Sequence, residues 1–513
     1  MERTGAVTLV GAGCGRDLIT VKGLCALQQA DVVVYDDLID KNLLLETRPE
    51  CERIYVGKRM GKHSHGQEEI HRLLALKAGA GKRVVRLKGG DSFVFGRGGE
   101  EILYLQKKGI AYEVIPGVTS AVAVPGHGGI PVTHRGMARS VTIVTGHSAS
   151  GEEENYKALA ALDGTLVFLM GLGRIGEITQ ALMDAGKEPD TPAAILSKGY
   201  NADEKRIDGT LSDIAGKAAQ ARTPAVLVVG EVAALKLAQT LRRELDGVSV
   251  TVTGTEAFVK KAVGLFGGLG AQAMGLPCLR VVPEPENIPA SLTGFDWLVF
   301  TSVNGVEIFF RDLFRKKADL RSLAPFRFAC IGPGTAAKLS EYGIYADFQP
   351  GLFTAGNLGE GLASRLLPGE RVLILRAGEG SGALTAELEK AEGTGGISFE
   401  DVAIYHTEAI RERIGGALVE TDYIVFGSAR GVEAFFSKGD FSDRTRPVCI
   451  GPQTAKAFEK VKPGKSPSGE ESCLIPRQYT VEGIAAEIIK DRVNSYRSVN
   501  ICTPAGAGRW ELE

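Results

Sequence analysis

The sequence lacks the cysteine and histidine patterns that build metal sites. Its eight cysteines are scattered, and no two of them stand at C-x-x-C spacing. His63, His65 and His71 lie close together in the chain but have no cysteine near them. Zinc or iron–sulfur ligation by a local motif is therefore not expected, and we predict no metal. Scattered cysteines in a chain of this size are typical of reduced, mostly buried thiols in a cytosolic protein.

An excess of charge of one sign and long apolar runs are also missing. Sixty Lys and Arg residues stand against 62 Asp and Glu residues, which gives a net charge of −2. Nucleic-acid affinity requires concentrated basic charge, so this balance argues against a nucleic-acid partner. No apolar run approaches the ~20 residues that a membrane helix needs. We expect neither a signal peptide nor a membrane span, and therefore a soluble cytoplasmic protein.

Length and composition indicate a folded protein of several domains. A chain of 513 residues is too long for one hydrophobic core. Its 44% hydrophobic and 24% charged residues exclude a largely disordered or fibrous chain. Glycine is in excess, with 66 residues, roughly twice the usual ~7% share. This excess predicts many tight turns at which the backbone approaches a neighbour or a ligand.

Short apolar runs alternate with helical patterns along the chain, which predicts an α/β fold with mostly parallel, buried strands. The helical pattern is clearest over residues 67–78. The alternation of apolar runs and helical patterns is interrupted by the charged stretch 235–246 and resumes at residue 248. We therefore place a domain boundary near residue 245, with domains at 1–245 and 246–513. The runs in the first domain are residues 7–10, 32–35, 84–87, 141–145, 166–170, 193–196 and 225–229.

The second half contains an internal repeat. DWLVFTSVNGVEIFF at 296–310 reappears as DYIVFGSARGVEAFF at 422–436, and CIGPGTA at 330–336 reappears as CIGPQTA at 449–455. Each unit reads as strand, serine-bearing turn, helix, strand, Gly-Pro turn and helix. We expect two similar α/β lobes that face each other across a cleft, because open α/β sheets bind ligands at the carboxyl ends of their strands. A duplication kept only for packing is the alternative.

The first half carries four glycine-rich loops. GAGCG at 11–15 follows an apolar run but lacks the G-x-G-x-x-G spacing, so a ligand loop and a simple tight turn both remain open. KGGDSFVFGRGGEE at 88–101 has so many glycines that a regular element is disfavoured, which indicates compensation by a ligand. PGVTS at 116–120 and GHGGIPVTHR at 126–135 are the other two loops.

Together, and in this order, these motifs resemble the tetrapyrrole methylase family, in particular its uroporphyrinogen-III C-methyltransferases, over about residues 5–240. The resemblance also rests on VYDDL, VGKR, VTGH, MGL and PAVLVVGEV. It implies two α/β subdomains with S-adenosylmethionine in the cleft between them, and a homodimer. It further implies two methyl transfers to uroporphyrinogen III, which give precorrin-2 at the head of the sirohaem and cobalamin routes.

The resemblance also implies roles for individual residues. Asp36 in VYDDL would be the base and Lys58 in VGKR the proton donor. From the residues alone, Asp36 as a helix cap, Lys58 as a surface residue and Met170 as a core residue remain alternatives. The residues that would bind the donor are Gly11, Gly13, Cys14, Gly89, Gly90, Asp91, Val94, Thr119, Ser120, Met170, Gly199, Pro224 and Ala225.

Two positions depart from the family pattern. The first loop reads GAGCGRD at 11–17 where the family has GAGPGDP, and it lacks both of the family's prolines. Ser92 stands where the family has proline after GGD. Because proline fixes φ, we expect its loss to loosen the first loop.

The second half resembles uroporphyrinogen-III synthases over about residues 248–492, through its FTS and FGS segments and its two IGP turns. The resemblance implies two α/β lobes joined by a pair of strands, with lobe 1 at about 248–284 and 410–490 and lobe 2 at about 288–404. It implies closure of hydroxymethylbilane to uroporphyrinogen III without cofactor or metal. The first strand lacks the family's arginine, and the tail 493–513 has no counterpart.

A cleft for a polycarboxylate needs N–H groups and hydroxyls, and helix starts supply the former. Tyr405 matches the family's tyrosine and is the candidate that assists departure of the substrate hydroxyl. N-capping is the alternative role of each serine or threonine. The predicted substrate contacts are Thr301, Ser302, Asn304, Thr335, Arg376, Ser428 and Thr454.

The combined interpretation is a fusion of consecutive enzymes, in which the second half makes uroporphyrinogen III and the first half methylates it. One alternative is a methyltransferase whose second half is a degenerate tetrapyrrole-binding module. Others are an NAD-type dehydrogenase that uses the loop at 11–15 and a non-enzymatic tetrapyrrole carrier.

Overall fold

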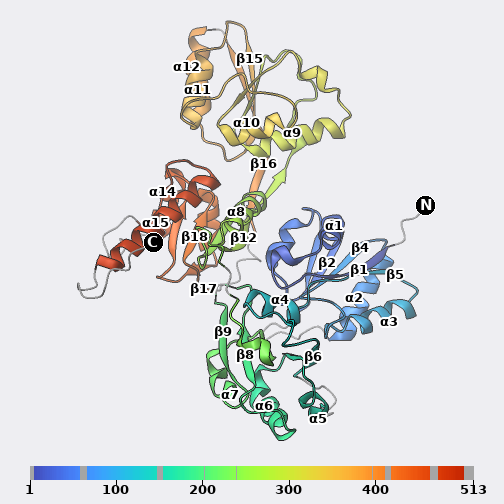
Figure 1. Ribbon diagram of the computed structural model, residues 1–513. Coiled ribbons are helices and arrows are strands. Elements are labelled where there is room, and N and C mark those ends of the chain that lie inside the picture. The colour runs from blue at the N-terminus through green and yellow to red at the C-terminus, as the bar shows by residue number, and fades with distance from the viewer. Residues whose placement is uncertain are drawn as a thin grey trace. The chain divides into compact units, whose positions relative to one another are not determined.

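The structure, a computed structural model, describes residues 5–57, 66–146, 154–201, 203–237, 240–395, 397–410, 418–462 and 472–501. The chain forms two compact units (Figure 1). One comprises residues 1–250 and 262–275, and the other comprises residues 251–261 and 276–513. Within these described ranges, no helix has the length and apolar character that crossing a membrane requires.

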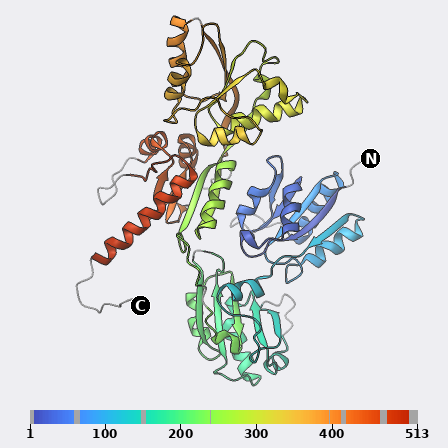
Figure 2. The same cartoon turned by 45° about the horizontal axis from the view of Figure 1, so that its top comes forward.

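The first unit begins with a five-stranded sheet of order β3-β2-β4-β1-β5, in which every pair is parallel. Alternate strand residues face opposite layers: Val7 and Leu9 pack with helices α2 and α3, whereas Val10 packs with α1. Figure 2 shows this sheet in blue. The elements are β1 (Ala6–Gly11), α1 (Val21–Gln29), β2 (Val32–Tyr35), β3 (Glu52–Tyr55), α2 (Gln67–Gly79), β4 (Arg83–Lys88), α3 (Gly98–Lys107) and β5 (Ala111–Ile115).

A second five-stranded sheet follows, of order β6-β7-β10-β8-β9. Only β6 and β7 pair in parallel, and the other three pairs are antiparallel. The prediction of mostly parallel strands is therefore wrong for this sheet. A strand buried on both faces has the same continuous apolar run in either direction, so its sequence does not reveal its orientation. The elements are α4 (Ser120–His127), β6 (Val141–Thr145), α5 (Tyr156–Ala160), β7 (Thr165–Leu169), α6 (Ile175–Asp184), β8 (Pro192–Ser197), β9 (Lys205–Thr210), α7 (Ile214–Lys217) and β10 (Ala225–Val229).

The second unit is built on an eight-stranded sheet of order β14-β13-β15-β16-β12-β11-β18-β20. Its strands and helices are β11 (Ser249–Thr255), α8 (Glu256–Gly268), β12 (Gln272–Pro283), β13 (Trp297–Phe300), α9 (Val303–Arg315), β14 (Arg327–Cys330), α10 (Pro333–Ser340), α11 (Ala355–Ala363), β15 (Arg371–Ala377), α12 (Ala383–Gly395), β16 (Ser398–Ala409), β17 (Leu418–Val419), β18 (Tyr423–Phe426), α13 (Ala429–Phe436), β19 (Asp440–Phe441), β20 (Arg446–Cys449), α14 (Pro452–Val461) and α15 (Val481–Ile501).

Strands β12 and β16 join two separate cores. Each strand is 12 residues long, and the two pair in antiparallel fashion. One core draws on residues between 288 and 405, and the other on residues 278–279 and 419–473. The second unit is therefore bilobal, with a pair of strands shared by both lobes.

The sequence repeat is confirmed as a structural repeat. Strand β13 pairs in parallel with β14, and β18 pairs in parallel with β20 in the same register, so that Phe300 stands beside Cys330 and Phe426 beside Cys449. Helices α9 and α13 both begin after a capping serine. Helices α10 and α14 both begin with the proline of the Gly-Pro turn.

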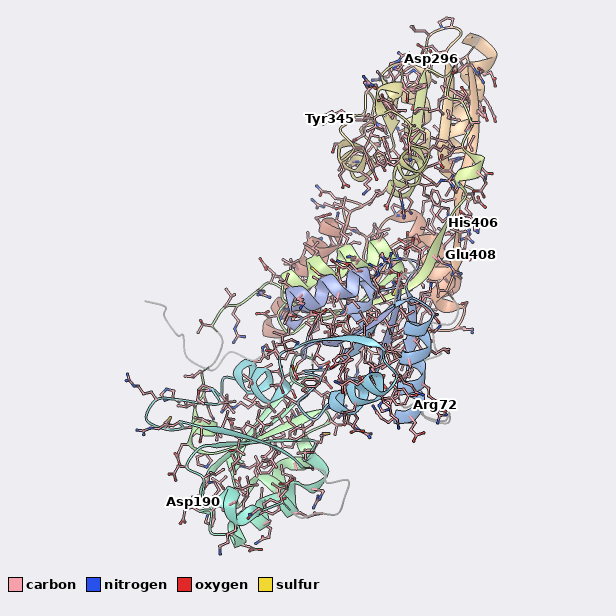
Figure 3. All side chains as sticks on the ribbon, turned by 90° about the vertical axis from the view of Figure 1, so that its right-hand side faces the viewer. Arg72, Asp190, Asp296, Tyr345, His406 and Glu408 are labelled. Atoms are coloured by element: carbon pink, nitrogen blue, oxygen red, sulfur yellow. The ribbon has the colours of Figure 1, made fainter. Side chains whose placement is uncertain are left out.

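Charged side chains interact on and directly beside the paired strands. His406 Nδ1 lies 2.9 Å from Glu284, and His406 Nε2 lies 3.3 Å from Glu408. Arg280 pairs with Glu408 at 3.1 Å. Figure 3 labels His406 and Glu408 on β16. Between its two carboxylates, His406 has a raised pKa, with the larger contribution from Glu408.

Candidate functional site

Four loops of the first unit leave the same edge of the parallel sheet. Asp36 follows β2, the pair Gly89 and Gly90 follows β4, and Gly13 follows β1. The loop at 116–119 follows β5 and leads into α4 (Figure 1). Carboxyl ends of parallel strands meet at one edge, so the predicted base and the glycine loops lie at the same end of this sheet.

The glycine loops pack backbone against backbone. Gly13 and Gly90 exchange two backbone hydrogen bonds of 3.1 and 2.8 Å. Both residues have a positive φ, 71° for Gly13 and 64° for Gly90. A Cβ at Gly11 would lie 2.4 Å from the nitrogen of Gly117, and a Cβ at Gly117 would lie 2.2 Å from the oxygen of Gly90. Larger residues would force these loops apart, so glycine is required here by close approach.

Asp91 ties two of these loops together. Its Oδ1 accepts from the Phe93 amide at 2.8 Å, and its Oδ2 accepts from the Gly117 amide at 2.9 Å. Val94 and Cys14 then pack into the same apolar cluster at the second sheet. The hydroxyl of Ser92 is buried and has no hydrogen-bond partner among the described residues. The structure thus brings Cys14, Asp91 and Val94 together around the glycine loops.

Polar contacts restrain the first loop, which lacks the family's prolines. The amide of Arg16 donates to Asp40 Oδ2 at 3.0 Å, and the guanidinium of Arg16 pairs with Glu46 at 3.0 Å. Burial raises the pKa of Asp40. Cys14 Sγ also lies 3.7 Å from the carbonyl of Val118 in the third loop. The first loop is therefore held by polar contacts to two neighbouring segments.

The remaining predicted donor residues lie at turns and helix starts. Thr119 caps α4, and Ser120 is the first residue of that helix. Met170 is 57% exposed with a φ of 57°, so the alternative that Met170 is a core residue is wrong. The Lys198 amide donates to the carbonyl of Pro224 at 2.7 Å, which links the Gly199 turn to Pro224 and Ala225.

Asp36 is held by a buried guanidinium. Its Oδ2 accepts from Arg86 at 2.9 Å, and its Oδ1 accepts from the Leu38 amide at 3.1 Å. The helix-cap alternative is wrong, because Asp40 caps the short helix at Lys41–Glu46. Lys58, the predicted proton donor, lies outside the described residues.

Behind Asp36 lies a buried charge network that the sequence motifs did not identify. Glu101 is fully buried and pairs with Lys88 at 2.9 Å and with Arg86 at 3.4 Å. Burial lowers the pKa of Lys88. A charged residue at alternate positions of an otherwise apolar strand, as in RVVRLK, is the sequence signal that marks this network.

In the second unit, the structure brings three predicted residues together. Ser302 Oγ and the Tyr405 hydroxyl lie 2.7 Å apart, and the side chain of Asn304 also hydrogen-bonds Tyr405. Burial raises the pKa of Tyr405, so its phenol keeps its proton at neutral pH. Ser302 at the same time caps α9 through the Gly305 amide at 3.0 Å. Cap and site contact therefore coexist in Ser302.

The other predicted contacts have different surroundings. Ser428 caps α13 through the Gly431 amide at 3.1 Å. Thr335 and Thr454 are buried in the first turns of α10 and α14, where glycines occupy the cap positions. Capping is thus not their role. Thr301 directly follows β13 and precedes Ser302.

Arg376 is buried and already paired. Its guanidinium contacts both oxygens of Asp401, at 2.8 and 2.5 Å, and donates to the carbonyl of Ser381. Its charge is therefore matched within the lobe. Asp401 is a partner that the sequence motifs did not identify.

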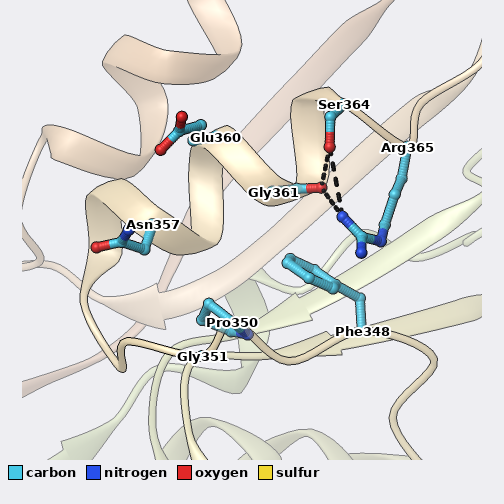
Figure 4. Close-up of a pocket in the computed structure, with 8 residues that line it drawn as sticks. All are labelled: Phe348, Pro350, Gly351, Asn357, Glu360, Gly361, Ser364 and Arg365. Atoms are coloured by element: carbon cyan, nitrogen blue, oxygen red, sulfur yellow. Dashed lines mark hydrogen bonds between the residues drawn. The ribbon is translucent and has the colours of Figure 1, made fainter.

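A cavity of about 310 Å³ lies beside α11 (Figure 4). It is lined by the segment around Phe348, by one face of α11 and by the residues that directly follow this helix. Among these, Arg365 stacks over the Phe348 ring at 4.1 Å. None of the predicted substrate contacts is among its lining residues in the described part of the chain. This cavity is therefore separate from the Ser302–Tyr405 pair.

Comparison with known proteins identifies both halves. The family described as Tetrapyrrole (Corrin/Porphyrin) Methylases matches residues 6–215, and the family described as Uroporphyrinogen-III synthase HemD matches residues 260–486. The porphyrin biosynthesis protein HemD of Ruminiclostridium josui is 38% identical over 89% of this chain and 94% of its own length. The uroporphyrinogen-III C-methyltransferase of Methanocaldococcus jannaschii is 56% identical over 45% of this chain and 97% of its own length.

Among solved structures, the uroporphyrin-III C-methyl transferase of Thermus thermophilus, complexed with S-adenyl homocysteine, is 41% identical. The match covers 45% of this chain and 94% of that chain, with a TM-score of 0.40. The two family matches and the relative that spans nearly the whole chain agree with the order of the two units. The chain therefore belongs to the family of bifunctional tetrapyrrole biosynthesis enzymes in which a tetrapyrrole methylase is followed by a uroporphyrinogen-III synthase.

Proposed function

We propose that the first half transfers two methyl groups from S-adenosylmethionine to uroporphyrinogen III, which gives precorrin-2. We propose further that the second half closes hydroxymethylbilane to uroporphyrinogen III. The observation that carries this proposal is the position of Asp36, held by Arg86 at the sheet edge from which the glycine loops also leave. The domains would be 1–245 and 246–513, with lobes at about 248–284 and 410–490 and at about 288–404.

The residues around the glycine loops fit the proposed donor. Gly11, Gly13 and Gly117 leave no room for a Cβ, and Gly13 and Gly90 have positive φ, so these loops meet through close backbone packing. The donor would be held by these loops together with Cys14, Gly89, Asp91, Val94, Thr119, Ser120, Met170, Gly199, Pro224 and Ala225. When bound, it would supply an electrophilic methyl carbon.

The chain's own part in methyl transfer is alignment and proton removal. The Asp36 carboxylate is fixed by Arg86 on one oxygen and by the Leu38 amide on the other. It would accept the proton that the methylated ring carbon must lose. Lys58 would return a proton to the macrocycle.

In the second half, Tyr405 would donate a proton to the hydroxyl that leaves hydroxymethylbilane. Its raised pKa keeps the phenol protonated, and Ser302 and Asn304 fix its direction. The N–H groups at the starts of α9, α10, α13 and α14 would bind substrate carboxylates. The buried, paired Arg376 would act by fixing the Ser381 loop.

Alanine substitution of the two serines at equivalent positions of the repeat distinguishes a capping role from a catalytic role. Ser302→Ala and Ser428→Ala each remove one cap, and each is expected to destabilise the second unit by about 1 kcal/mol. Ser302→Ala also removes a hydrogen bond to Tyr405, so we expect about tenfold slower ring closure than in Ser428→Ala. Urea unfolding and the rate of uroporphyrinogen III formation measure the two effects. Equal rates of uroporphyrinogen III formation in both variants would show that the Ser302–Tyr405 hydrogen bond does not contribute to ring closure.

One experiment tests both activities on the full chain. Hydroxymethylbilane alone should give uroporphyrinogen III, and addition of labelled S-adenosylmethionine should give a product with two labelled methyl groups by mass spectrometry. Only spontaneous uroporphyrinogen I in the first reaction would contradict the synthase and favour the degenerate-module alternative. One or three methyl groups, or none, from added uroporphyrinogen III would contradict the methylation step.

We also propose a homodimer formed through the methyltransferase half and a cytoplasmic location. The reduced state of the cysteines supports the location, because Cys14, Cys25, Cys51, Cys278, Cys330, Cys449 and Cys473 are all unbridged. Light scattering of the full chain at several concentrations tests the dimer. A monomer mass at every concentration would contradict it.

A further inference from the structure

The turn between β8 and β9 has an unfavourable backbone. Lys198 and Tyr200 flank Gly199 and have φ values of 52° and 66°. Residues other than glycine rarely adopt this left-handed backbone conformation. Gly199 itself is pressed against α4, because a Cβ there would lie 2.7 Å from Val124. A strained turn of this kind persists only where surrounding contacts hold it.

Glu204 supplies such a contact. Its Oε2 accepts from the Tyr200 amide at 2.7 Å and lies 3.2 Å from Nε2 of His127, the last residue of α4. A single carboxylate oxygen thus links the turn to the helix. Hydrogen bonding with Glu204 raises the pKa of His127, which favours the charged imidazolium and strengthens this link.

The ring of Tyr200 extends the link to the first glycine loop. It stacks on His127 with ring centroids 4.3 Å apart, and its hydroxyl donates to the carbonyl of Ala123 at 3.3 Å. On its other side, Tyr200 Cδ1 lies 3.4 Å from the position that a Cβ of Gly15 would take. Tyr200 and Cys14 belong to the same apolar cluster. The ring therefore connects α4, the Gly199 turn and the loop at 11–15.

We propose that His127, Tyr200 and Glu204 form a clamp that positions the donor-binding loops and so sets the affinity for S-adenosylmethionine. The inference rests on the proposed methyltransferase function, which places Gly199 and Cys14 at the donor. The three are positioning residues, because they act through the turn and the loop. The clamp ties the Gly199 turn to α4 through Glu204 and supports the first loop through the Tyr200 ring.

The first test is calorimetric binding of S-adenosylhomocysteine to full-chain variants. Glu204→Gln keeps an oxygen for the Tyr200 amide but removes the charge that faces His127, and we expect about three- to tenfold weaker binding. Tyr200→Ala removes the stacked ring, and we expect at least about tenfold weaker binding. Tyr200→Phe keeps the ring and should bind within about twofold of the unmodified protein. Glu177→Gln, which removes an exposed partner of Arg174 on α6, is the matched control and should bind normally.

Steady-state kinetics then separate positioning from chemistry. In Glu204→Gln and Tyr200→Ala the KM for S-adenosylmethionine should rise by the same factors, while kcat falls by less than about threefold, because the clamp does not touch Asp36. Urea unfolding of each variant without ligand checks that the fold is intact. Tyr200→Phe and Glu204→Gln keep the test decisive even if Tyr200→Ala does not fold.

The pH dependence of S-adenosylhomocysteine binding is a further test, because simple destabilisation of the fold would not change it. The charged group that faces His127 is Glu204 from the turn, and the titratable groups beyond it are the phenol of Tyr200 and the thiol of Cys14. Burial raises the pKa of Tyr200, and it raises the pKa of Cys14 to about 11, so both stay neutral between pH 6 and 8. As pH rises through the raised pKa of His127 the ion pair is lost, so binding should weaken from pH 6 to pH 8.

Glu204→Gln should bind S-adenosylhomocysteine with less dependence on pH over this range. Binding as tight as in the unmodified protein for both Tyr200→Ala and Glu204→Gln would overturn the clamp and leave the methyltransferase proposal intact. Failure of the unmodified protein to bind S-adenosylhomocysteine would overturn the proposed function itself, and the clamp with it.

Discussion

Asp36→Asn is expected to slow methyl transfer to uroporphyrinogen III by about 10²–10⁴-fold, the range that a positioned general base contributes. The amide keeps one acceptor oxygen, so the residue can still accept from either Arg86 or the Leu38 amide, but it does not take up a proton. Binding of S-adenosylhomocysteine should change by less than about twofold, because the glycine loops are untouched. Single-turnover transfer of labelled methyl groups measures the rate.

Asp37→Asn is the matched control for this prediction. Asp37 is the next residue, half exposed, and its carboxylate bonds the hydroxyl of Tyr55 instead of Arg86. We expect methyl transfer within about twofold of the unmodified rate, as for most surface substitutions. A normal rate in Asp36→Asn would remove Asp36 from the mechanism, and an equal loss in both variants would point to disruption of the whole VYDDL segment.

Tyr405→Phe is expected to slow formation of uroporphyrinogen III by about 10²-fold or more, because the variant has no phenolic proton to give to the leaving hydroxyl. The side chain is almost fully buried, and phenylalanine fills nearly the same volume, so the fold should persist. Chromatography of the isomers formed from hydroxymethylbilane should show mainly the spontaneous product, uroporphyrinogen I.

Tyr342→Phe controls for loss of a phenol elsewhere in the same lobe. The Tyr342 ring stacks on Phe310 with centroids 4.2 Å apart, a contact that phenylalanine retains. The isomer ratio should match that of the unmodified protein. If Tyr405→Phe also gave a normal ratio, the proton would have to come from another group.

The strands and the repeat could be predicted because their signal is local. Val32–Tyr35, Val141–Thr145 and Ala225–Val229 are mostly apolar runs bounded by polar residues, glycine or proline, and the structure forms strands at these limits. Strand direction in the second sheet could not be predicted, because it depends on which neighbours each strand meets in space. β8, for example, pairs with β10 in antiparallel fashion although both are plain apolar runs.

In the candidate site, too, features with a local sequence signal could be predicted and features that depend on contacts in space could not. The glycine loops could be predicted because so many glycines close together disfavour any regular element, and Asp36 and Tyr405 stand in recognisable motifs. Glu101, Glu204 and Asp401 could not be predicted, because each meets its partner only through the packing of the folded chain. Glu101 lies beside Lys88 only because α3 packs on the sheet, and Glu204 reaches His127 only when the turn after β8 meets α4.

The two copies of the repeat in the second unit have equivalent strands and helices but different side-chain contacts. Ser302 and Ser428 cap equivalent helices, yet only Ser302 has a tyrosine partner among the residues that the structure describes. Where the first repeat has Asn304, the second has Arg430, which pairs with Glu379 from the other lobe. A linear molecule that spanned both repeats would meet the Tyr405 phenol at one end and an ion pair at the other. The two equivalent ends of the duplicated scaffold therefore differ in charge and in hydrogen-bonding groups, which makes them distinguishable to such a molecule.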